Sequence, residues 1–145
     1  MLEKMVQLLK SSCSCVLATC SNNRPHCSLM AYVTDDAGRT VYMITRKKSR
    51  KYGNMQENPL VSFLVDTRGA GDSQDMSQVS ALTVHGSFHP LANPAEKQAV
   101  LNRLLERQPH LKELTDHPDI EVFSIAVESF LLLDGVVNAY FEILQ

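Results

Sequence analysis

The chain has 145 residues, of which 44% are hydrophobic and 21% are charged, and its formal net charge is −2. This length predicts one domain covering residues 1–145, and the composition is that of an ordinary soluble globular protein. The nearly balanced charge argues against a nucleic-acid partner. The chain shows neither an apolar run long enough to span a bilayer nor a signal-peptide pattern. We therefore expect a cytoplasmic protein with no membrane partner.

The first predicted element is an amphipathic helix, because Leu2, Met5, Val6 and Leu9 recur at helical spacing. Runs rich in apolar and β-branched residues, separated by polar turns, then predict strands. Their ranges are 14–20, 25–33, 39–45, 60–66, 79–90, 120–129 and 139–144. Six or seven strands at hairpin spacing, with few helical crossovers, predict a mainly β fold built as a small antiparallel barrel.

Two more helices interrupt the strands. One is predicted over residues 50–57, with Ser49 as its N-cap and Asn58-Pro59 as its stop. The other begins at Asn93-Pro94, runs to about Arg107, and should bury Val100, Leu101, Leu104 and Leu105. A short helical turn is expected to follow at residues 110–114.

The most informative segment is the basic turn TRKKSRK, residues 45–51, which lies between a predicted strand and the helix at 50–57. A helix N-terminus carries partial positive charge and free amide donors, so Arg50 and Lys51 stand at the unfavourable end. A phosphate bound there would be stabilised by the free amides, the Ser49 hydroxyl and the Arg50 guanidinium. The alternatives are a solvated basic surface and, less compatible with the net charge, a nucleic-acid patch.

The cysteines and histidines give no metal motif. Cys13, Cys15, Cys20 and Cys27 have no zinc-site spacing, and we interpret Cys15 and Cys20 as buried apolar residues, leaving the roles of the other two open. All five histidines are expected to be surface or hydrogen-bonded side chains. His85 and His89 are the only two that we would test as haem or metal ligands, and we predict no bound metal.

The order of these elements resembles the FMN-binding split β-barrel of the pyridoxamine 5′-phosphate oxidase-like proteins. The resemblance covers residues 14 to 90, and its motifs are VLAT, Arg24-Pro25, Asp35-Asp36, VYMIT, SRK, NMQENP and LVSFLV. It implies an antiparallel split β-barrel of Greek-key type with six to seven strands, and a homodimer that binds FMN in a cleft at the subunit interface.

The resemblance also implies roles for individual residues at the phosphate end of FMN. Arg50 and Lys51 match the basic pair that binds the phosphate, and Ser49 precedes this pair as in the family motif. Ile44 and Thr45 match the strand end that lines the flavin.

A second strand matches the one that runs along the isoalloxazine ring and the ribityl chain of the flavin. Its matching residues are Ser28, Leu29 and Met30. The sequence departs from the family at Ser28, where an arginine often stands. Met43 and Ile44 face opposite sides of one strand, so at most one of these two side chains can contact the ring.

We therefore expect an FMN-dependent oxidoreductase whose substrate the sequence does not assign. In the family that the sequence resembles, true pyridoxamine 5′-phosphate oxidase activity goes with a substrate segment rich in Arg and Trp. That activity is disfavoured here, because the segment GVVNAYFEILQ contains neither Trp nor Arg. One alternative is a non-catalytic module that stores or senses FMN or holds haem on the same barrel. Another is a barrel without a flavin, whose basic turn binds a different phosphate ligand or a nucleic acid.

Overall fold

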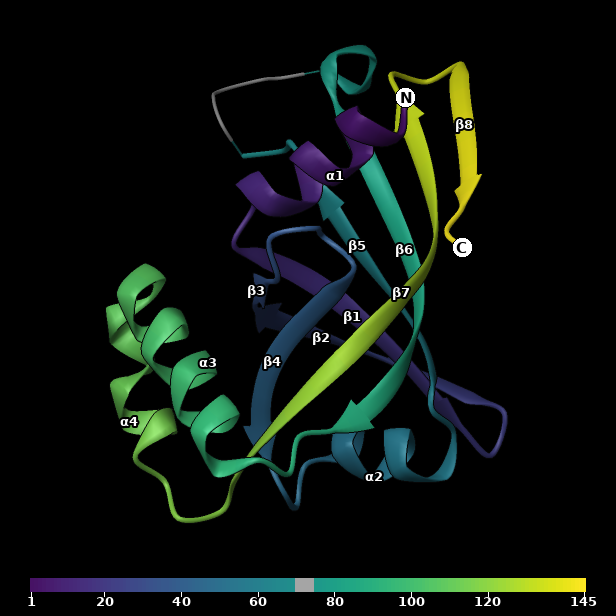
Figure 1. The fold of residues 1–145 in the computed structure, drawn as a ribbon. Helices are drawn as coiled ribbons and strands as arrows, with labels where there is room; N and C mark the ends of the chain where they lie inside the picture. Colours follow the sequence, from purple (N-terminus) through teal and green to yellow (C-terminus); the bar gives the residue numbers. More distant parts are fainter. Residues whose placement is uncertain (70–74) are drawn as a thin grey trace.

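The computed structural model describes residues 1–69 and 75–145 and shows one curled, mostly antiparallel sheet flanked by helices (Figure 1). Its strands are β1 (Ser14–Ser21), β2 (Arg24–Ala31), β3 (Val33–Thr34), β4 (Thr40–Arg46), β5 (Leu60–Asp66), β6 (Ser80–Pro90), β7 (Ile120–Asp134) and β8 (Asn138–Ile143). Its helices are α1 (Leu2–Ser11), α2 (Arg50–Glu57), η1 (Met76–Gln78), α3 (Pro94–Arg107), η2 (Pro109–Leu111) and α4 (Lys112–Thr115).

The strand order is β2-β1-β5-β6-β7-β4-β3, with β8 paired to β7, and the pairs are antiparallel. The two ends of this order, β2 and β3, are consecutive in the chain. The sheet therefore curls until its first and last strands come together, without hydrogen bonding into a closed cylinder. The predicted mainly β fold and the antiparallel split barrel are both confirmed.

The prediction of one strand over residues 25–33 was wrong, because the chain changes its pairing partner at Tyr32. β2 pairs with β1, whereas β3 pairs with β4. Tyr32 itself is 1% exposed, and its hydroxyl donates a hydrogen bond to the Leu9 carbonyl at 2.6 Å. Burial raises the pKa of the Tyr32 phenol, so this hydroxyl keeps its proton. The described residues consequently form eight strands.

The predicted strand over residues 120–129 was too short. β7 continues to Asp134 and pairs with β6 on one side and with β8 on the other over its C-terminal half. Phe130 and Leu132 point into the core, while Leu131 and Leu133 point outward. The FLLLD run is therefore a strand that is apolar on both faces, and its inside and outside cannot be separated by alternation alone.

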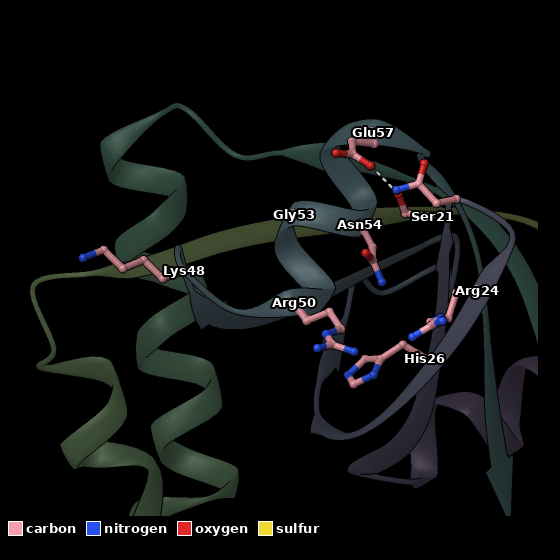
Figure 2. A pocket seen from close by; sticks show the side chains of 9 residues that line it. Ser21, Arg24, His26, Lys48, Arg50, Gly53, Asn54 and Glu57 are labelled. Atoms are coloured by element: carbon pink, nitrogen blue, oxygen red, sulfur yellow. Dashed lines mark hydrogen bonds between the residues drawn. The ribbon is translucent and has the colours of Figure 1, made fainter.

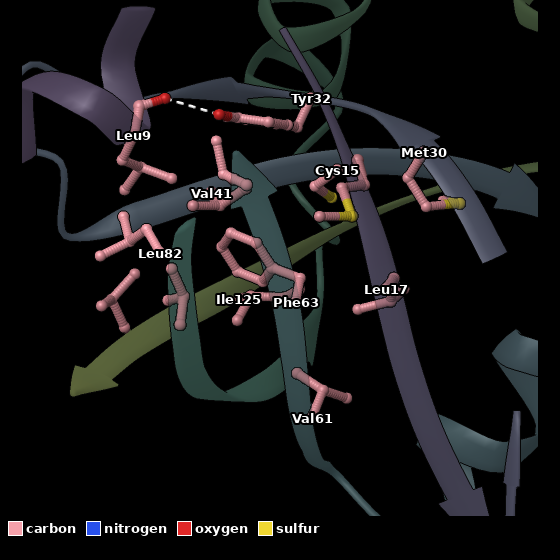
Figure 3. Packing of buried hydrophobic residues seen from close by; sticks show 14 of the residues in the cluster. Leu9, Cys15, Leu17, Met30, Tyr32, Val41, Val61, Phe63, Leu82 and Ile125 are labelled. Carbon is pink, nitrogen blue, oxygen red and sulfur yellow. Dashed lines mark hydrogen bonds between the residues drawn. The ribbon is translucent and has the colours of Figure 1, made fainter. Parts of the chain in front are cut away.

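The main core fills the concave side of the sheet (Figure 3). Leu17, Phe63, Leu82 and Ile125 are at most 1% exposed and come from four different strands. The sequence-predicted amphipathic helix α1 closes one end of the barrel, because its Met5 and Leu9 side chains are fully buried in the same cluster. Among the cysteines, Cys15 is buried as predicted, but Cys20 is only half-buried.

Helix α2 lies against the opposite end of the barrel (Figure 1). The Tyr52 ring packs edge-on against Phe88, with 5.7 Å between ring centroids and 88° between planes. The Asn54 side-chain amide donates to the Thr19 hydroxyl at 3.0 Å, which ties α2 to β1. These contacts fix the position of the N-terminus of α2 relative to the sheet.

Helix α3 packs outside β3, β4 and β7 and forms a second, smaller core with them. Asn93 caps it as predicted, since its side-chain oxygen accepts from the Glu96 amide at 3.1 Å. Val100 and Leu104 are buried, but Leu101 and Leu105 are only half-buried. None of the helices in the described residues has the length and hydropathy of a membrane-spanning helix.

We expect Gly86→Ala to lower the free energy of unfolding by about 1–3 kcal/mol, because the added methyl group has no room. Gly86 lies at the irregularity between β6 and β7, where a Cβ would approach the Ala126 carbonyl oxygen to 2.5 Å and the Ile125 Cγ2 atom to 2.7 Å. Chemical denaturation measures the change.

The matched control is Gly53→Ala in α2, where a Cβ would meet nothing within 4 Å. Alanine favours a helix interior over glycine by about 0.5–1 kcal/mol, so this variant should be at least as stable as the parent chain. Equal losses in the two variants would contradict the steric explanation.

Candidate functional site

The site is organised by the N-terminus of α2, where the sequence places no acidic residue in the first turn. Ser49 is the N-cap, in extended conformation, and its hydroxyl accepts from the Tyr52 amide at 3.3 Å. The Thr45 hydroxyl, at the end of β4, lies 2.9 Å from the Ser49 hydroxyl. The cap therefore joins the strand end to the helix start, as the spacing of the basic turn predicts.

A cavity of 280 Å³ lies beside this cap, and we call it the β2–β4 cavity. Its lining residues are Leu29, Met30, Ile44, Thr45, Arg46, Ser49, Lys51 and Leu114. One wall is aliphatic and sulfur-containing, and the other carries hydroxyl groups and cations. Six of the eight site residues predicted from the sequence thus lie around one cavity. Leu114, which comes from α4, had no sequence signal.

Leu29 and Met30 both line the β2–β4 cavity although adjacent residues of a strand point to opposite faces. The reason is that β2 is the first strand of the sheet, so the cavity wraps around its free edge. Met30 is buried, but Leu29 is 79% exposed. On β4, Ile44 lines the cavity while Met43 is fully buried in the main core, so these two side chains separate as the strand alternation predicts.

Lys51 is the cation of the β2–β4 cavity that is most withdrawn from water. Burial lowers the pKa of its amine, which means that the charged form is desolvated without compensation. No acidic side chain is among the described residues that line this cavity. Such a cation is stabilised by an anion that enters the cavity.

The other cations of the basic turn have different surroundings. Arg46 pairs with Asp119 at 3.8 Å, and Lys47 and Lys48 are exposed. Arg50 does not face the β2–β4 cavity. It lines a larger cavity on the other side of the first turn of α2.

That larger cavity has a volume of 820 Å³ and lies between α2 and the β1–β2 hairpin; we call it the hairpin cavity (Figure 2). Its lining residues are Ser21, Asn22, Arg24, His26, Lys48, Arg50, Gly53, Asn54 and Glu57. Arg24 and His26 were not assigned to a site from the sequence. A signal was available, because they stand four and two positions before Ser28 and so share its face of β2. Ser28 itself lines neither of the two cavities.

The two histidines singled out as possible ligands are exposed and make hydrogen bonds to serines. His85 Nδ1 lies 2.8 Å from the Ser62 hydroxyl, and His89 Nε2 lies 3.2 Å from the Ser87 hydroxyl. Within residues 1–69 and 75–145, no group of three or more His, Cys, Asp or Glu side chains could hold a metal ion.

Comparison with known proteins identifies the family of this chain. A protein-family model described as pyridoxamine 5′-phosphate oxidase matches residues 1–134. The chain belongs to this family. A Schizosaccharomyces pombe protein described as a pyridoxamine 5′-phosphate oxidase homolog is 38% identical over 164 residues, covering 94% of this chain and 86% of the relative. The resemblance found from the sequence motifs is thereby confirmed.

Solved structures of other proteins share the fold of this family member. A heme binding protein from Mycobacterium smegmatis superimposes with a TM-score of 0.82 at 17% identity, over 97% of this chain and 57% of that chain. A FAD-binding protein from Mesorhizobium loti gives a TM-score of 0.72 at 17% identity, over 91% of this chain and 93% of that chain. At such low identity the likeness concerns the fold, and the two ligands are those of the two neighbours.

Proposed function

We propose that the chain is a homodimeric FMN-binding flavoprotein and an FMN-dependent oxidoreductase, with its cofactor in the β2–β4 cavity. The observation that carries this proposal is the polarity of that cavity. An aliphatic wall faces a half-buried, uncompensated Lys51 amine at a serine-capped helix start. FMN has the matching polarity, with a flat apolar ring at one end and a phosphate of nearly two negative charges at the other.

In this proposal the phosphate lies at the first turn of α2. The Lys51 amine would donate a charge-assisted hydrogen bond, and the free amides of the helix start would donate as well. The Ser49 hydroxyl accepts from the Tyr52 amide and shares a hydrogen bond with the Thr45 hydroxyl, so it would donate to a phosphate oxygen with Thr45 as the donor of that shared bond. Arg50 would reach the same phosphate from the hairpin cavity, across one turn of the helix.

The ring and the ribityl chain would follow the edge of β2 and the end of β4. Leu29, Met30 and Ile44 would cover the ring and exclude water from it, and Thr45 would contact the ribityl chain. Ser28 lines neither cavity, so its side chain would have to move to contact the ribityl chain of the flavin. Bound FMN would supply hydride and electron transfer, and the protein's residues would hold it, orient it and tune its surroundings.

A homodimer is supported by a row of side chains on the outer face of the sheet that is apolar except at Thr83, and we call it the outer stripe. Residues paired directly across antiparallel strands point to the same face. The pairs run without interruption across six strands, through Leu29, Val16, Leu64, Thr83, Leu131 and Phe141. Leu29 belongs both to this stripe and to the β2–β4 cavity. A second copy packed on the stripe would therefore cover the open side of the cofactor site.

Phe141→Glu should shift the protein from dimer to monomer, because it places a charge in the outer stripe at a side chain that is 56% exposed. Light scattering coupled to size-exclusion chromatography measures the mass. Met76→Glu is the control, since Met76 is 62% exposed but lies in η1, off the strands that form the stripe. A dimer that survives the Phe141 change, or a monomeric parent chain, would contradict the stripe as interface.

Lys51→Gln should weaken FMN binding by a factor of about 10 to 100, the effect of losing one charge-assisted hydrogen bond. The melting temperature of the flavin-free variant should not fall. The folded-state pKa of Lys51 is lowered, so the charged amine opposes folding at neutral pH and its removal relieves that cost. Calorimetric titration and thermal melting measure the two effects, with the exposed Lys47→Gln as control. Unchanged FMN affinity would remove the phosphate assignment.

The visible spectrum of the purified protein tests the cofactor itself. We expect the two-band absorbance of an oxidised flavin, retained after desalting, and its bleaching by NADH or NADPH followed by recovery when an acceptor is added. Bleaching and recovery support the oxidoreductase, whereas a bound flavin that no donor reduces supports a storage or sensing module. A colourless protein that takes up no FMN would overturn the proposal.

Haem is the second candidate, because a haem-binding neighbour shares the fold. The lining of the β2–β4 cavity offers only Met30 among common axial ligands, with no His, Cys or Tyr from the described residues. His85 would have to bind haem on the outer face of the sheet, where it contacts Ser62. A Soret band that His85→Ala abolishes would favour haem over flavin.

A further inference from the structure

A cavity of 320 Å³ opens on the outer face of the sheet, and we call it the outer cavity. Strands β1, β2, β5, β6 and β7 contribute to its lining. It lies beside the outer stripe, because Ser62 and His85 stand two positions along β5 and β6 from the stripe residues Leu64 and Thr83. None of its lining residues belongs to the β2–β4 cavity, so it is a site of its own.

The centre of this cavity is a hydrogen-bonded pair of a serine and a histidine. Ser62 and His85 stand directly opposite each other on β5 and β6, and the His85 Nδ1 atom lies 2.8 Å from the Ser62 hydroxyl oxygen. A general base at this distance can take the proton of a serine nucleophile. In the tautomer that carries its proton on Nε2, the imidazole accepts from Ser62 at Nδ1 and presents an N–H group that an acid can orient.

An irregularity of the sheet supplies an acid beside this pair. The register between β6 and β7 shifts between His85 and Gly86, and Glu128 on β7 has no partner on β6. Val127 and Phe130 both lie in the main core although they are three positions apart, which regular strand alternation does not allow. The bulge therefore turns the Glu128 side chain outward, and this exposed carboxylate lines the same cavity as His85.

The fold makes no other use of these polar groups. Within the described residues, neither the His85 Nε2 atom nor the Glu128 carboxylate makes a hydrogen bond or an ion pair. Ser62, His85 and Glu128 thus follow one another on three neighbouring strands, β5, β6 and β7, around one hollow. A serine, a base and an acid in this order are the parts of a nucleophilic site.

The remaining wall of the outer cavity is suited to an acyl group. Ala18, Pro25 and Leu60 contribute apolar side chains to it. Its volume of 320 Å³ is near the lower end of the range for small-molecule sites, so a short acyl chain fits better than a long one.

We propose that the outer cavity is a hydrolytic site for carboxylic esters with a short acyl group. Ser62 is the nucleophile, His85 is the general base, and Glu128 stabilises the imidazole while it is protonated. This activity is separate from the proposed flavin chemistry, because the two sites share no residue.

The reaction has two steps. In the first, the Ser62 oxygen forms a bond to the carbonyl carbon of the ester while its proton passes to His85 Nδ1. The bond from that carbon to the alkoxy oxygen then breaks, and the alcohol leaves with the proton from His85. In the second step a water molecule gives one proton to His85 and its oxygen bonds to the acyl carbon. The Ser62 oxygen leaves, takes the proton back, and a carboxylic acid is released.

Turnover of p-nitrophenyl acetate by the full chain, followed by release of p-nitrophenol, tests the proposal. Ser62→Ala and His85→Ala should each lower kcat/KM by about 100-fold, the loss expected when a positioned nucleophile or base is removed. Glu128→Gln should lower kcat by about 10-fold with KM unchanged, as for an interaction made only in the transition state. A fluorophosphonate reagent should label Ser62 in the parent chain and not in His85→Ala, as mapped by peptide mass spectrometry.

A second serine–histidine pair on the same strand provides the matched control. The Ser87 hydroxyl lies 3.2 Å from His89 Nε2, but neither residue lines the outer cavity. Ser87→Ala and His89→Ala should therefore leave both hydrolysis and labelling unchanged.

Three results would each overturn the inference: no turnover by the parent chain, undiminished hydrolysis in Ser62→Ala, or equal losses in Ser62→Ala and Ser87→Ala. Labelling at another residue instead of Ser62 would do the same. The FMN affinity of Ser62→Ala should equal that of the parent chain, so the flavin site is judged separately. Thermal melting checks the fold of each variant, and the residue labelled in the parent chain decides if Ser62→Ala does not fold.

Discussion

The arrangement of the whole sheet depends on the exchange of strand partners at Tyr32. Before this residue the chain is hydrogen-bonded to β1, and after it the chain is hydrogen-bonded to β4, at the far end of the strand order. The phenol that marks the corner is buried and donates to the Leu9 carbonyl, so the corner and the helix that closes the barrel are held by one contact. A buried hydroxyl left without that partner would cost about 1–3 kcal/mol.

This corner also creates the candidate site. Because β2 ends the strand order, its edge is free, and the end of β4 comes close to it through the curl of the sheet. Residues from the two strands can then line one cavity although they are far apart in the order of pairing. Helix α2, fixed by Tyr52 against Phe88 and by Asn54 against Thr19, brings its N-terminus to the same place.

Helix α2 carries cations at its N-terminus, where helices usually favour acidic residues. This reversal is the clearest functional signal in the chain. Cations at the positive end of a helix, with no acid in the first turn, destabilise the free protein unless water or an anion compensates them. The structure divides these cations between two cavities. Lys51 is withdrawn from water beside an aliphatic wall, and Arg50 joins Arg24 and His26 on the other side of the helix. The flavin that we propose, with its phosphate and its ring, would complement such an arrangement.

Local patterns predicted much of the fold. The cap at Ser49, the helix at 50–57 and the cap at Asn93 depend on residues within a few positions of one another, and all three are observed. The break at Tyr32 and the extension of β7 were missed because they depend on strands that are distant in the sequence. Likewise, alternation could pair Arg24 and His26 with Ser28 on one face but could not show that Arg50 approaches them from α2.

The sequence by itself determined the family and the antiparallel barrel, because these follow from periodicity, capping and motif order, and it predicted an anion at the basic turn. Only the tertiary structure showed which cation lines which cavity, and which face of β2 lies toward α2. The reason is physical. Burial, and with it the lowered pKa of Lys51, depends on which surfaces the curl of the sheet brings together, and this contact is made between segments far apart in the chain.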